Sequence, residues 1–298
     1  MNFYAGVDGG GTKTAVLCMN ERGETTARAI FGPFNITSVG REGLRRAMDE
    51  ILGFICAQGN CLRLCIGAAG AGSAALGREV AAVMANYPHI PYELVGDYEV
   101  ARCGALGGRP GVALVAGTGS VCSGVNAAGE TLRVGGWGHL IGDGGSGYAL
   151  GRDALRELTL SLDGMAEKGL LCRLLEEEFS LTSRAAIVER AYGMDKSATA
   201  ALAACVLRAA DEGDAAARRI LRDNARELAA LVRATALPLE LTAPDTALLG
   251  GLMKSGSSYR RAVTEEISRA LPGARCVEPA FGPDMGAALM AREGARHG

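Results

Sequence analysis

The sequence is poor in aromatic residues, in histidine and in net charge. Aromatic residues make up 5% of the 298 positions, with a single Trp, and there are only three His. The 31 basic residues nearly balance the 33 acidic ones, which gives a formal net charge of −2. A chain without a basic excess is not a nucleic-acid or membrane binder that acts through bulk charge. We therefore expect neither nucleic acid nor membrane as a partner.

Long apolar runs and paired cysteines are also missing. No apolar run approaches the ~18 residues that a membrane span needs, and the opening MNFYAGVDGGG lacks the regions of a signal peptide. The nine cysteines include no C-x-x-C pair, and Cys56, Cys61 and Cys65 match no familiar zinc or iron–sulfur spacing. We expect a cytoplasmic protein whose thiols are reduced and act as small apolar side chains.

Glycine, in contrast, is abundant, and the chain divides into two units. The 43 Gly are about twice the usual ~7%, which indicates backbone that approaches other groups closely. Periodicity predicts a βββαβαβα order in the first unit: strands 3–8, 15–19 and 25–31, helix 40–55, strand 62–66, helix 74–84, strand 92–95 and helix 98–106. The second unit begins at position 112 and is richer in helix: strand 112–116, helices 146–162, 197–209 and 215–237, strand 246–249 and helix 284–291.

The two units repeat each other. A shift of 106 positions superimposes six identical residues within fifteen: Gly11, Thr12, Asn20, Gly23, Glu24 and Thr25 fall on Gly117, Thr118, Asn126, Gly129, Glu130 and Thr131. Each half thus opens with a strand, a Gly-Thr loop, a strand, a turn and a strand. An internal duplication predicts two similar lobes with a ligand cleft between them; two hairpins that converged by chance are the alternative.

The first Gly-Thr loop has the composition of a phosphate site. Asp8 ends a strand, where a carboxylate can hold hydrated magnesium, and Gly9-Gly10-Gly11 leave backbone N–H groups open to phosphate oxygens. With its echo at Gly117-Thr118-Gly119-Ser120, this loop would hold a triphosphate from two sides. The alternative is a glycine hairpin with Asp8 as a turn cap. The chain contains no Gly-Lys pair, so it has no P-loop.

A dinucleotide-binding unit is a rival interpretation. Gly70-Ala71-Gly72-Ser73-Ala74-Ala75 lies between a strand and a helix, and the next strand ends in Asp97. The acid comes 27 residues after Gly70, beyond the usual ~20, and a βββα segment precedes the unit. A second match at Gly142-x-Gly144-x-x-Gly147 lacks a leading strand.

The densest glycine segment is Gly135–Gly147. It has seven Gly among thirteen residues, together with Trp137, His139 and Asp143, and it precedes a helix. Such a loop can fold tightly onto a ligand, and Asp143 could accept hydrogen bonds from sugar hydroxyls. The alternative is an Ω-loop packed on itself, and for His139 a supporting role is the simpler reading.

These motifs occur together, and in order, in a known family. The set is Asp8–Thr14, Gly32-Pro33-x-Asn35, Ala69-Gly70, Asp97, Ala116–Ser120, Gly135–Gly147 and Gly250-Gly251. The chain resembles the BadF/BadG/BcrA/BcrD ATPase family, in particular its N-acetylglucosamine kinase branch. The resemblance implies an α/β fold of two ribonuclease-H-like, actin-like ATPase lobes with a nucleotide cleft: residues 1–107, completed by 284–298, and residues 108–283.

The resemblance also implies roles for individual residues. Asp8 corresponds to a carboxylate linked to magnesium through water, and Asp97 to the base that deprotonates the attacking hydroxyl. Sugar contacts are implied for Asn35, Gly70, Asp97 and Asp143, with Trp137 in the same loop. ATP contacts are implied for Gly10, Gly11, Thr12, Lys13, Gly117, Thr118, Gly119, Ser120, Gly250 and Gly251.

The implied activity is ATP-dependent phosphorylation of an amino sugar, N-acetylglucosamine to its 6-phosphate, by a homodimer. Glucosamine and N-acetylmuramic acid are close alternatives. Other readings are an iron–sulfur ATPase activator of a 2-hydroxyacyl-CoA dehydratase or benzoyl-CoA reductase, a nicotinamide-dependent oxidoreductase, and a non-catalytic ATP-gated protein. Two departures from the family pattern concern the site: Gly96-Asp97-Tyr98 replaces Asn-Asp-Ala, and Gly144 replaces an acid.

Overall fold

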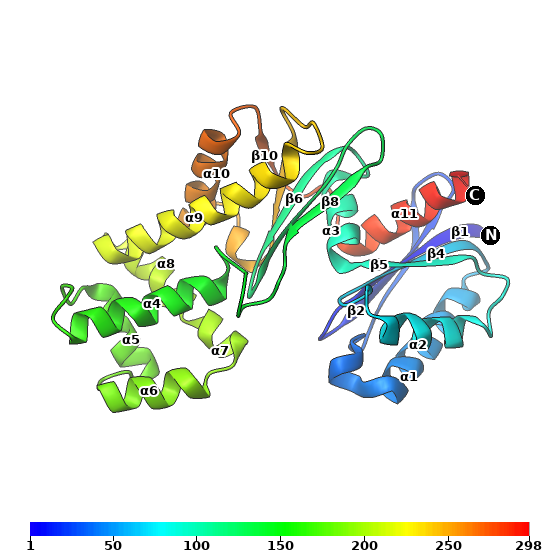
Figure 1. Cartoon of the computed structure of the whole chain (residues 1–298). Coiled ribbons are helices and arrows are strands. Elements are labelled where there is room, and N and C mark those ends of the chain that lie inside the picture. The colour runs from blue at the N-terminus through cyan, green and yellow to red at the C-terminus, as the bar shows by residue number, and fades with distance from the viewer. Residues whose placement is uncertain (298) are drawn as a thin grey trace. The chain divides into compact units, whose positions relative to one another are not determined.

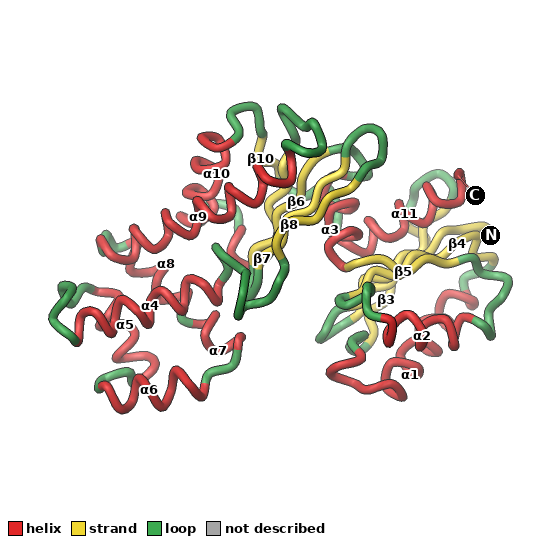
Figure 2. The backbone as a smooth tube through the Cα atoms, in the orientation of Figure 1, coloured by secondary structure: helices red, strands yellow, loops and turns green. Residues whose placement is uncertain are grey.

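The computed structural model describes residues 1–297, which form two units. Unit 1 contains Met1–Pro110 and the C-terminal segment from Glu278, and unit 2 is Gly111–Val277. Each unit is built on one five-stranded sheet with helices packed against it (Figure 1; Figure 2).

The sheet of unit 1 is mixed. An antiparallel meander of β1 (Asn2–Gly9), β2 (Thr14–Asn20) and β3 (Thr25–Phe31) is extended by β4 (Asn60–Ala68) and β5 (Tyr92–Gly96), which run parallel to β1. The strand order is β3-β2-β1-β4-β5. One apolar core joins the sheet to α1 (Ile36–Ala57) and α2 (Ala74–Met84), and smaller clusters join it to α3 (Asp97–Leu106) and α11 (Pro283–His297).

The C-terminal helix α11 packs so closely against β1 and α3 that their backbones are in contact. A side chain at Gly6 of β1 would overlap the backbone of Asp284 and Ala288, and one at Gly286 would overlap Val100 of α3. Glycine is required at these positions because two backbones meet there. The helix from a distant part of the sequence thereby becomes an integral part of unit 1.

Unit 2 repeats this topology. Its five strands are β6 (Gly111–Ala116), β7 (Ser120–Val125), β8 (Thr131–Gly135), β9 (Asp245–Leu249) and β10 (Arg275–Val277). They lie in the order β10-β9-β6-β7-β8. This is the order of unit 1 if β6 to β10 are taken as the counterparts of β1, β2, β3, β4 and β5, with the chain order β1-β2-β3 matching β6-β7-β8 and β4-β5 matching β9-β10. The repeat extends to single hydrogen bonds. The side-chain amide of Asn20 donates to the Glu24 carboxylate at 2.8 Å, and that of Asn126 donates to the Glu130 carboxylate at 2.6 Å. In both turns the Asn Oδ1 accepts two backbone N–H groups.

The helices of unit 2 differ most from those expected. They are α4 (Gly147–Leu162), α5 (Leu170–Phe179), α6 (Arg184–Gly193), α7 (Lys196–Ala201), α8 (Ala203–Asp211), α9 (Ala215–Ala236) and α10 (Ser258–Ala270), with a 3₁₀ turn at Gly251–Met253. The single helix predicted over 197–209 was wrong, because the chain breaks into α7 and α8 at Leu202. α5, α6, α10 and β10 carry no pattern from which they were predicted. In unit 1, α1 begins at Ile36 rather than at position 40, with a kink at Gly40, where φ is +69°.

Candidate functional site

The first Gly-Thr loop is a tight hairpin between β1 and β2. The Gly10 N–H donates to the Lys13 carbonyl at 3.1 Å. A side chain at Gly10 would approach that carbonyl to 2.7 Å, whereas at Gly11 it would meet no atom within 4 Å. Thr12 and Lys13 are exposed. The tip of the hairpin therefore offers backbone, a hydroxyl and an ammonium group to a ligand.

Asp8 lies beside this hairpin, close to other negatively charged side chains. It is two residues from Gly6, so its side chain is on the face of the sheet that α11 covers. The pKa of the Asp8 carboxyl is raised from 3.8 to about 6, mainly by burial and then by the nearby carboxylates of Asp284 and Asp97, against the opposing charge of Lys13. Asp284 is itself buried and pairs with Arg28 at 2.7 Å. A bound cation would relieve this concentration of negative charge.

Asp97 is the first residue of α3 and is exposed. Its Oδ1 accepts the N–H of Tyr98 at 2.9 Å, while Glu99 accepts the N–H of Gly96 at 2.9 Å. A side chain at Gly96 would overlap the Tyr98 ring. Gly96 and Tyr98, which replace the Asn and Ala of the family pattern, therefore depend on each other. The Tyr98 ring fills the space that a side chain at position 96 would need.

The loops that carry Asn35 and Gly70 lie at the same edge of the sheet as Asp8 and Asp97. β1, β3, β4 and β5 all run in one direction, so their carboxyl ends lie together. Asn35 follows β3, Gly70 follows β4 with φ of +78°, and the N–H of Phe34 donates to Gly10 O at 2.9 Å. The structure thus brings the predicted site residues of unit 1 to one edge.

The second Gly-Thr loop is held by the glycine-rich segment. In this hairpin, Gly117 N–H donates to Gly119 O at 2.9 Å, and the Gly147 N–H donates to Gly117 O at 2.8 Å. The Ser120 hydroxyl donates to Gly144 O at 2.7 Å. The end of the Gly135–Gly147 segment therefore packs directly against the predicted phosphate loop.

Asp143 is directed at this hairpin. It is 5% exposed and has φ of +60°, an uncommon conformation for a residue with a side chain. Its Oδ1 accepts the Ser120 N–H at 3.2 Å, and its Oδ2 accepts from Lys196 Nζ at 2.7 Å. Lys196 was not singled out from the sequence, because nothing in the local pattern links position 196 to position 143. The contact between Asp143 and a sugar remains a prediction.

The tip of the same segment is open to solvent. Trp137 is 74% exposed, and Leu140 and Ile141 are exposed as well. The His139 ring lies edge-on to Tyr148 of α4, with centroids 4.8 Å apart. The segment is therefore anchored at both ends, since the Gly136 N–H donates to Ser120 O at 3.0 Å, and it closes on itself through the Gly142 N–H to Gly138 O bond at 2.8 Å, while the side chains at its tip are exposed.

Gly250 and Gly251 differ in the space around them. Gly250 has φ of +100°, and a side chain there would overlap the backbone of Ala116 at the end of β6. Gly250 is thus required by packing within unit 2. At Gly251 a side chain would meet no atom within 4 Å, which leaves room for a ligand.

Position 144, where the family pattern has an acidic residue and this chain has Gly, lies beside a carboxylate from another element. A side chain at Gly144 would overlap Oε2 of Glu227, which reaches this place from α9. A carboxylate is therefore present beside the loop, although another element supplies it.

The cysteines do not form a metal site. Seven of the nine are buried, and burial raises the pKa of the Cys18 and Cys103 thiols to about 11. Among residues 1–297, no three His, Cys, Asp or Glu side chains are grouped as metal ligands. This geometry gives no support to the iron–sulfur alternative.

The dinucleotide alternative is also not supported. The predicted strand–turn–helix at Gly70 exists, but it belongs to a mixed sheet that opens with an antiparallel meander, not to a parallel Rossmann sheet.

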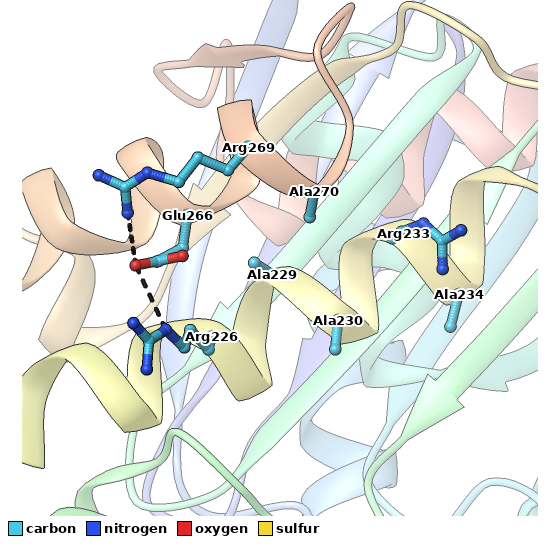
Figure 3. A pocket seen from close by; sticks show the side chains of 8 residues that line it. All are labelled: Arg226, Ala229, Ala230, Arg233, Ala234, Glu266, Arg269 and Ala270. Atoms are coloured by element: carbon cyan, nitrogen blue, oxygen red, sulfur yellow. Dashed lines mark hydrogen bonds and ion pairs between the residues drawn. The ribbon is translucent and has the colours of Figure 1, made fainter.

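One surface pocket lies outside the predicted site. It is formed by α9 and α10, with Glu266 between Arg226 (3.7 Å) and Arg269 (2.5 Å), as Figure 3 shows. None of the predicted site residues lines this pocket.

Two units of the same strand order, each opening in a Gly-Thr hairpin, define the two-lobed class of actin-like ATPases and sugar kinases. A provisionally named N-acetylglucosamine kinase from Chromobacterium violaceum has this fold, with a TM-score of 0.74 and 26% identity over 97% of this chain and 98% of that one. Residues 5–291 match the BadF/BadG/BcrA/BcrD ATPase family, and the chain belongs to that family.

Two curated relatives are sugar kinases by name. The N-acetylmuramic acid/N-acetylglucosamine kinase of Clostridium acetobutylicum is 33% identical over 242 residues, which cover 78% of this chain and 79% of that protein. The N-acetyl-D-glucosamine kinase of Dictyostelium discoideum is 28% identical, with 97% of both chains covered.

Proposed function

We propose that the protein transfers the γ-phosphoryl group of ATP to an amino sugar, with N-acetylglucosamine as substrate and its 6-phosphate as product. The observation that carries this proposal is the pair of Gly-Thr hairpins, related by the internal repeat, in a chain that matches two relatives named as kinases of this sugar over 79% and 97% of their lengths.

Phosphoryl transfer depends mainly on positioning and on charge stabilisation. In the proposed mechanism, Gly10–Lys13 and Gly117–Ser120 bind the phosphates, and Gly250-Gly251 accommodate the adenosine. Asp97 accepts the proton of the attacking hydroxyl, and its exposed position at the start of α3 leaves the carboxylate available for this.

Magnesium fits the residues around Asp8. Burial, and after it the nearby carboxylates of Asp284 and Asp97, raise the pKa of Asp8 and so disfavour its charged form, a penalty that a bound divalent cation would offset. Asp8 would hold the ion through water. The bound ion would supply charge neutralisation on the phosphates of ATP.

For the sugar we propose Asn35, Gly70, Asp97, Trp137 and Asp143 as the binding residues. The names of the relatives leave two acceptors besides N-acetylglucosamine: N-acetylmuramic acid, and glucosamine, which is the substrate named for a Vibrio cholerae relative that is 31% identical over 185 residues.

We further propose a cytoplasmic location, because the proposed substrate is ATP and the chain carries nine free cysteines, and a homodimer, which the family resemblance implies. Within residues 1–297, no helix combines the length and apolar character of a membrane span.

The direct test measures ADP formation with a panel of N-acetylglucosamine, glucosamine, N-acetylmuramic acid, glucose and no sugar. We expect ADP release that depends on an amino sugar, with the phosphate at position 6 by NMR of the product. Sugar-independent ATP hydrolysis, or turnover with none of the amino sugars, would refute the proposal.

A further inference from the structure

Lys196 brings a positive charge to the second phosphate loop from outside it. Its Nζ lies 2.7 Å from Asp143 Oδ2. A side-chain carbon built at Gly119 would be 2.9 Å from Lys196 Nζ and also 2.9 Å from Asp143 Oδ2. The ammonium group therefore lies directly over the backbone of the Gly117–Ser120 hairpin.

Close helix packing fixes the position of Lys196. It is the first residue of α7, which is capped by Asp195 through the Ala198 N–H at 2.7 Å. α7 rests on Gly147 and Gly151, one turn apart on α4. A side chain at Gly151 would overlap the Thr199 carbonyl, so the backbones are in contact. Thr199 and Ala200 of the short helix α7 are thus held against α4, whose first residue, Gly147, donates to Gly117 O of the hairpin.

Neutralisation of Asp143 accounts for only part of this arrangement. The Asp143 side chain is 3% exposed, and a buried carboxylate requires a partner. However, the Lys196 side chain keeps 34% of its surface exposed. An ammonium group has three donors, and a single one serves the ion pair with Asp143.

We propose that Lys196 binds a phosphate group of the nucleotide, and that Asp143 is the positioning residue that aims the ammonium at the hairpin. This inference rests on the proposed function, since it requires a nucleotide at the second loop. A compact, strongly charged ammonium suits a phosphate held by backbone N–H groups. It provides from α7 the charge that the hairpin itself, Gly-Thr-Gly-Ser, lacks.

The test compares nucleotide binding by wild type and Lys196→Met, using calorimetry with ATP, ADP and AMP in the presence of magnesium and without sugar. Loss of a charge-assisted hydrogen bond predicts ATP binding about 10- to 100-fold weaker. AMP binding should change much less, because the loss is confined to the outer phosphates. Lys168→Met is the matched control: Lys168 pairs with Glu176 at the surface of unit 2, and we expect no effect.

A double variant, Lys196→Met with Asp143→Asn, separates binding from structure. If Lys196 only neutralises Asp143, removal of both charges restores ATP affinity, and the proposal is wrong. If Lys196 binds phosphate, the double variant stays as weak as the single one. An unchanged ratio of ATP to AMP affinity in Lys196→Met would also overturn the proposal.

The outcomes distinguish this inference from the proposed function. Weakened ATP binding in Lys196→Met, together with no turnover of any amino sugar, supports Lys196 and refutes the sugar kinase. Wild type that binds no ATP refutes both.

Discussion

Replacement of Asp8 by Asn should stabilise the free protein while it abolishes function. The rise in the Asp8 pKa from 3.8 to about 6, at about 1.4 kcal/mol per tenfold change in acid dissociation, amounts to about 3 kcal/mol. The folded state thus disfavours the ionised carboxylate by up to that amount. Solvent screening around a partly exposed side chain makes this an upper limit.

The sign of the effect depends on pH. Well below pH 3.8, Asp8 is protonated in both the folded and the unfolded chain, so wild type and variant should be equally stable. Between about pH 3.8 and 6 the unfolded chain ionises Asp8 while the folded state keeps the carboxyl protonated, so wild type loses stability relative to Asp8→Asn, and the loss is complete above the folded-state pKa. At pH 8 we expect the variant to be more stable by up to about 3 kcal/mol, which corresponds to a Tm higher by about 6–12 °C.

The assay is thermal unfolding at pH values between 4 and 8 without divalent ions, and again with ATP and magnesium. We expect the advantage of Asp8→Asn to grow with pH, and the ligand to stabilise wild type much more than the variant. Asp49→Asn, at an exposed position of α1, is the control and should have little effect. A variant that is no more stable than wild type at pH 8 would refute the electrostatic reasoning, and one that keeps full turnover would remove Asp8 from the site.

Three further predictions follow from the site. Asp97→Asn should lower kcat about 10²- to 10⁴-fold while calorimetry shows sugar and ATP binding intact, and a rate within a few-fold of wild type would exclude Asp97 as the base. Gly144→Glu should lower the Tm in thermal unfolding, because the new side chain meets the carboxylate of Glu227. Adding Glu227→Ala should restore part of the lost Tm. A Gly144→Glu variant with an unchanged Tm would contradict the overlap. Saturating substrate sugar should alter tryptophan emission even without ATP, since Trp137 is the single Trp and lies exposed in the proposed sugar loop; unchanged emission with a proven substrate would remove that loop from the sugar site.

The strands and the repeat could be predicted because their signals are local. β1 and β6 are short apolar runs that end at glycines, and four of the six matched residues, Asn20 and Gly23 to Thr25, make the same turn as their counterparts from Asn126 to Thr131. The residues of unit 1 that were assigned to the site lie at one sheet edge for the same reason, since each follows a strand that runs in the same direction.

The contacts that the sequence did not indicate are long-range. Lys196 meets Asp143 across 53 positions, and Glu227 reaches Gly144 from α9. The boundary between α7 and α8 was difficult to predict because no Gly or Pro marks it and Leu202 itself keeps a helical conformation, with φ of −62° and ψ of −20°.

The close fit of α11 bears on how the chain is made. Because β1 and α3 receive α11 through glycine contacts, and because Ala280 N–H and Phe281 N–H donate to the end of α3 at 2.9 and 3.1 Å, unit 1 is completed by residues that are translated after all of unit 2. On the ribosome, unit 2 is complete in sequence while one face of the unit 1 sheet still lacks its cover. Unit 1 therefore finishes folding only after unit 2 has been synthesised, and a nascent chain stalled before Glu278 would expose the apolar side chains of β1, β2 and β4 that α11 buries.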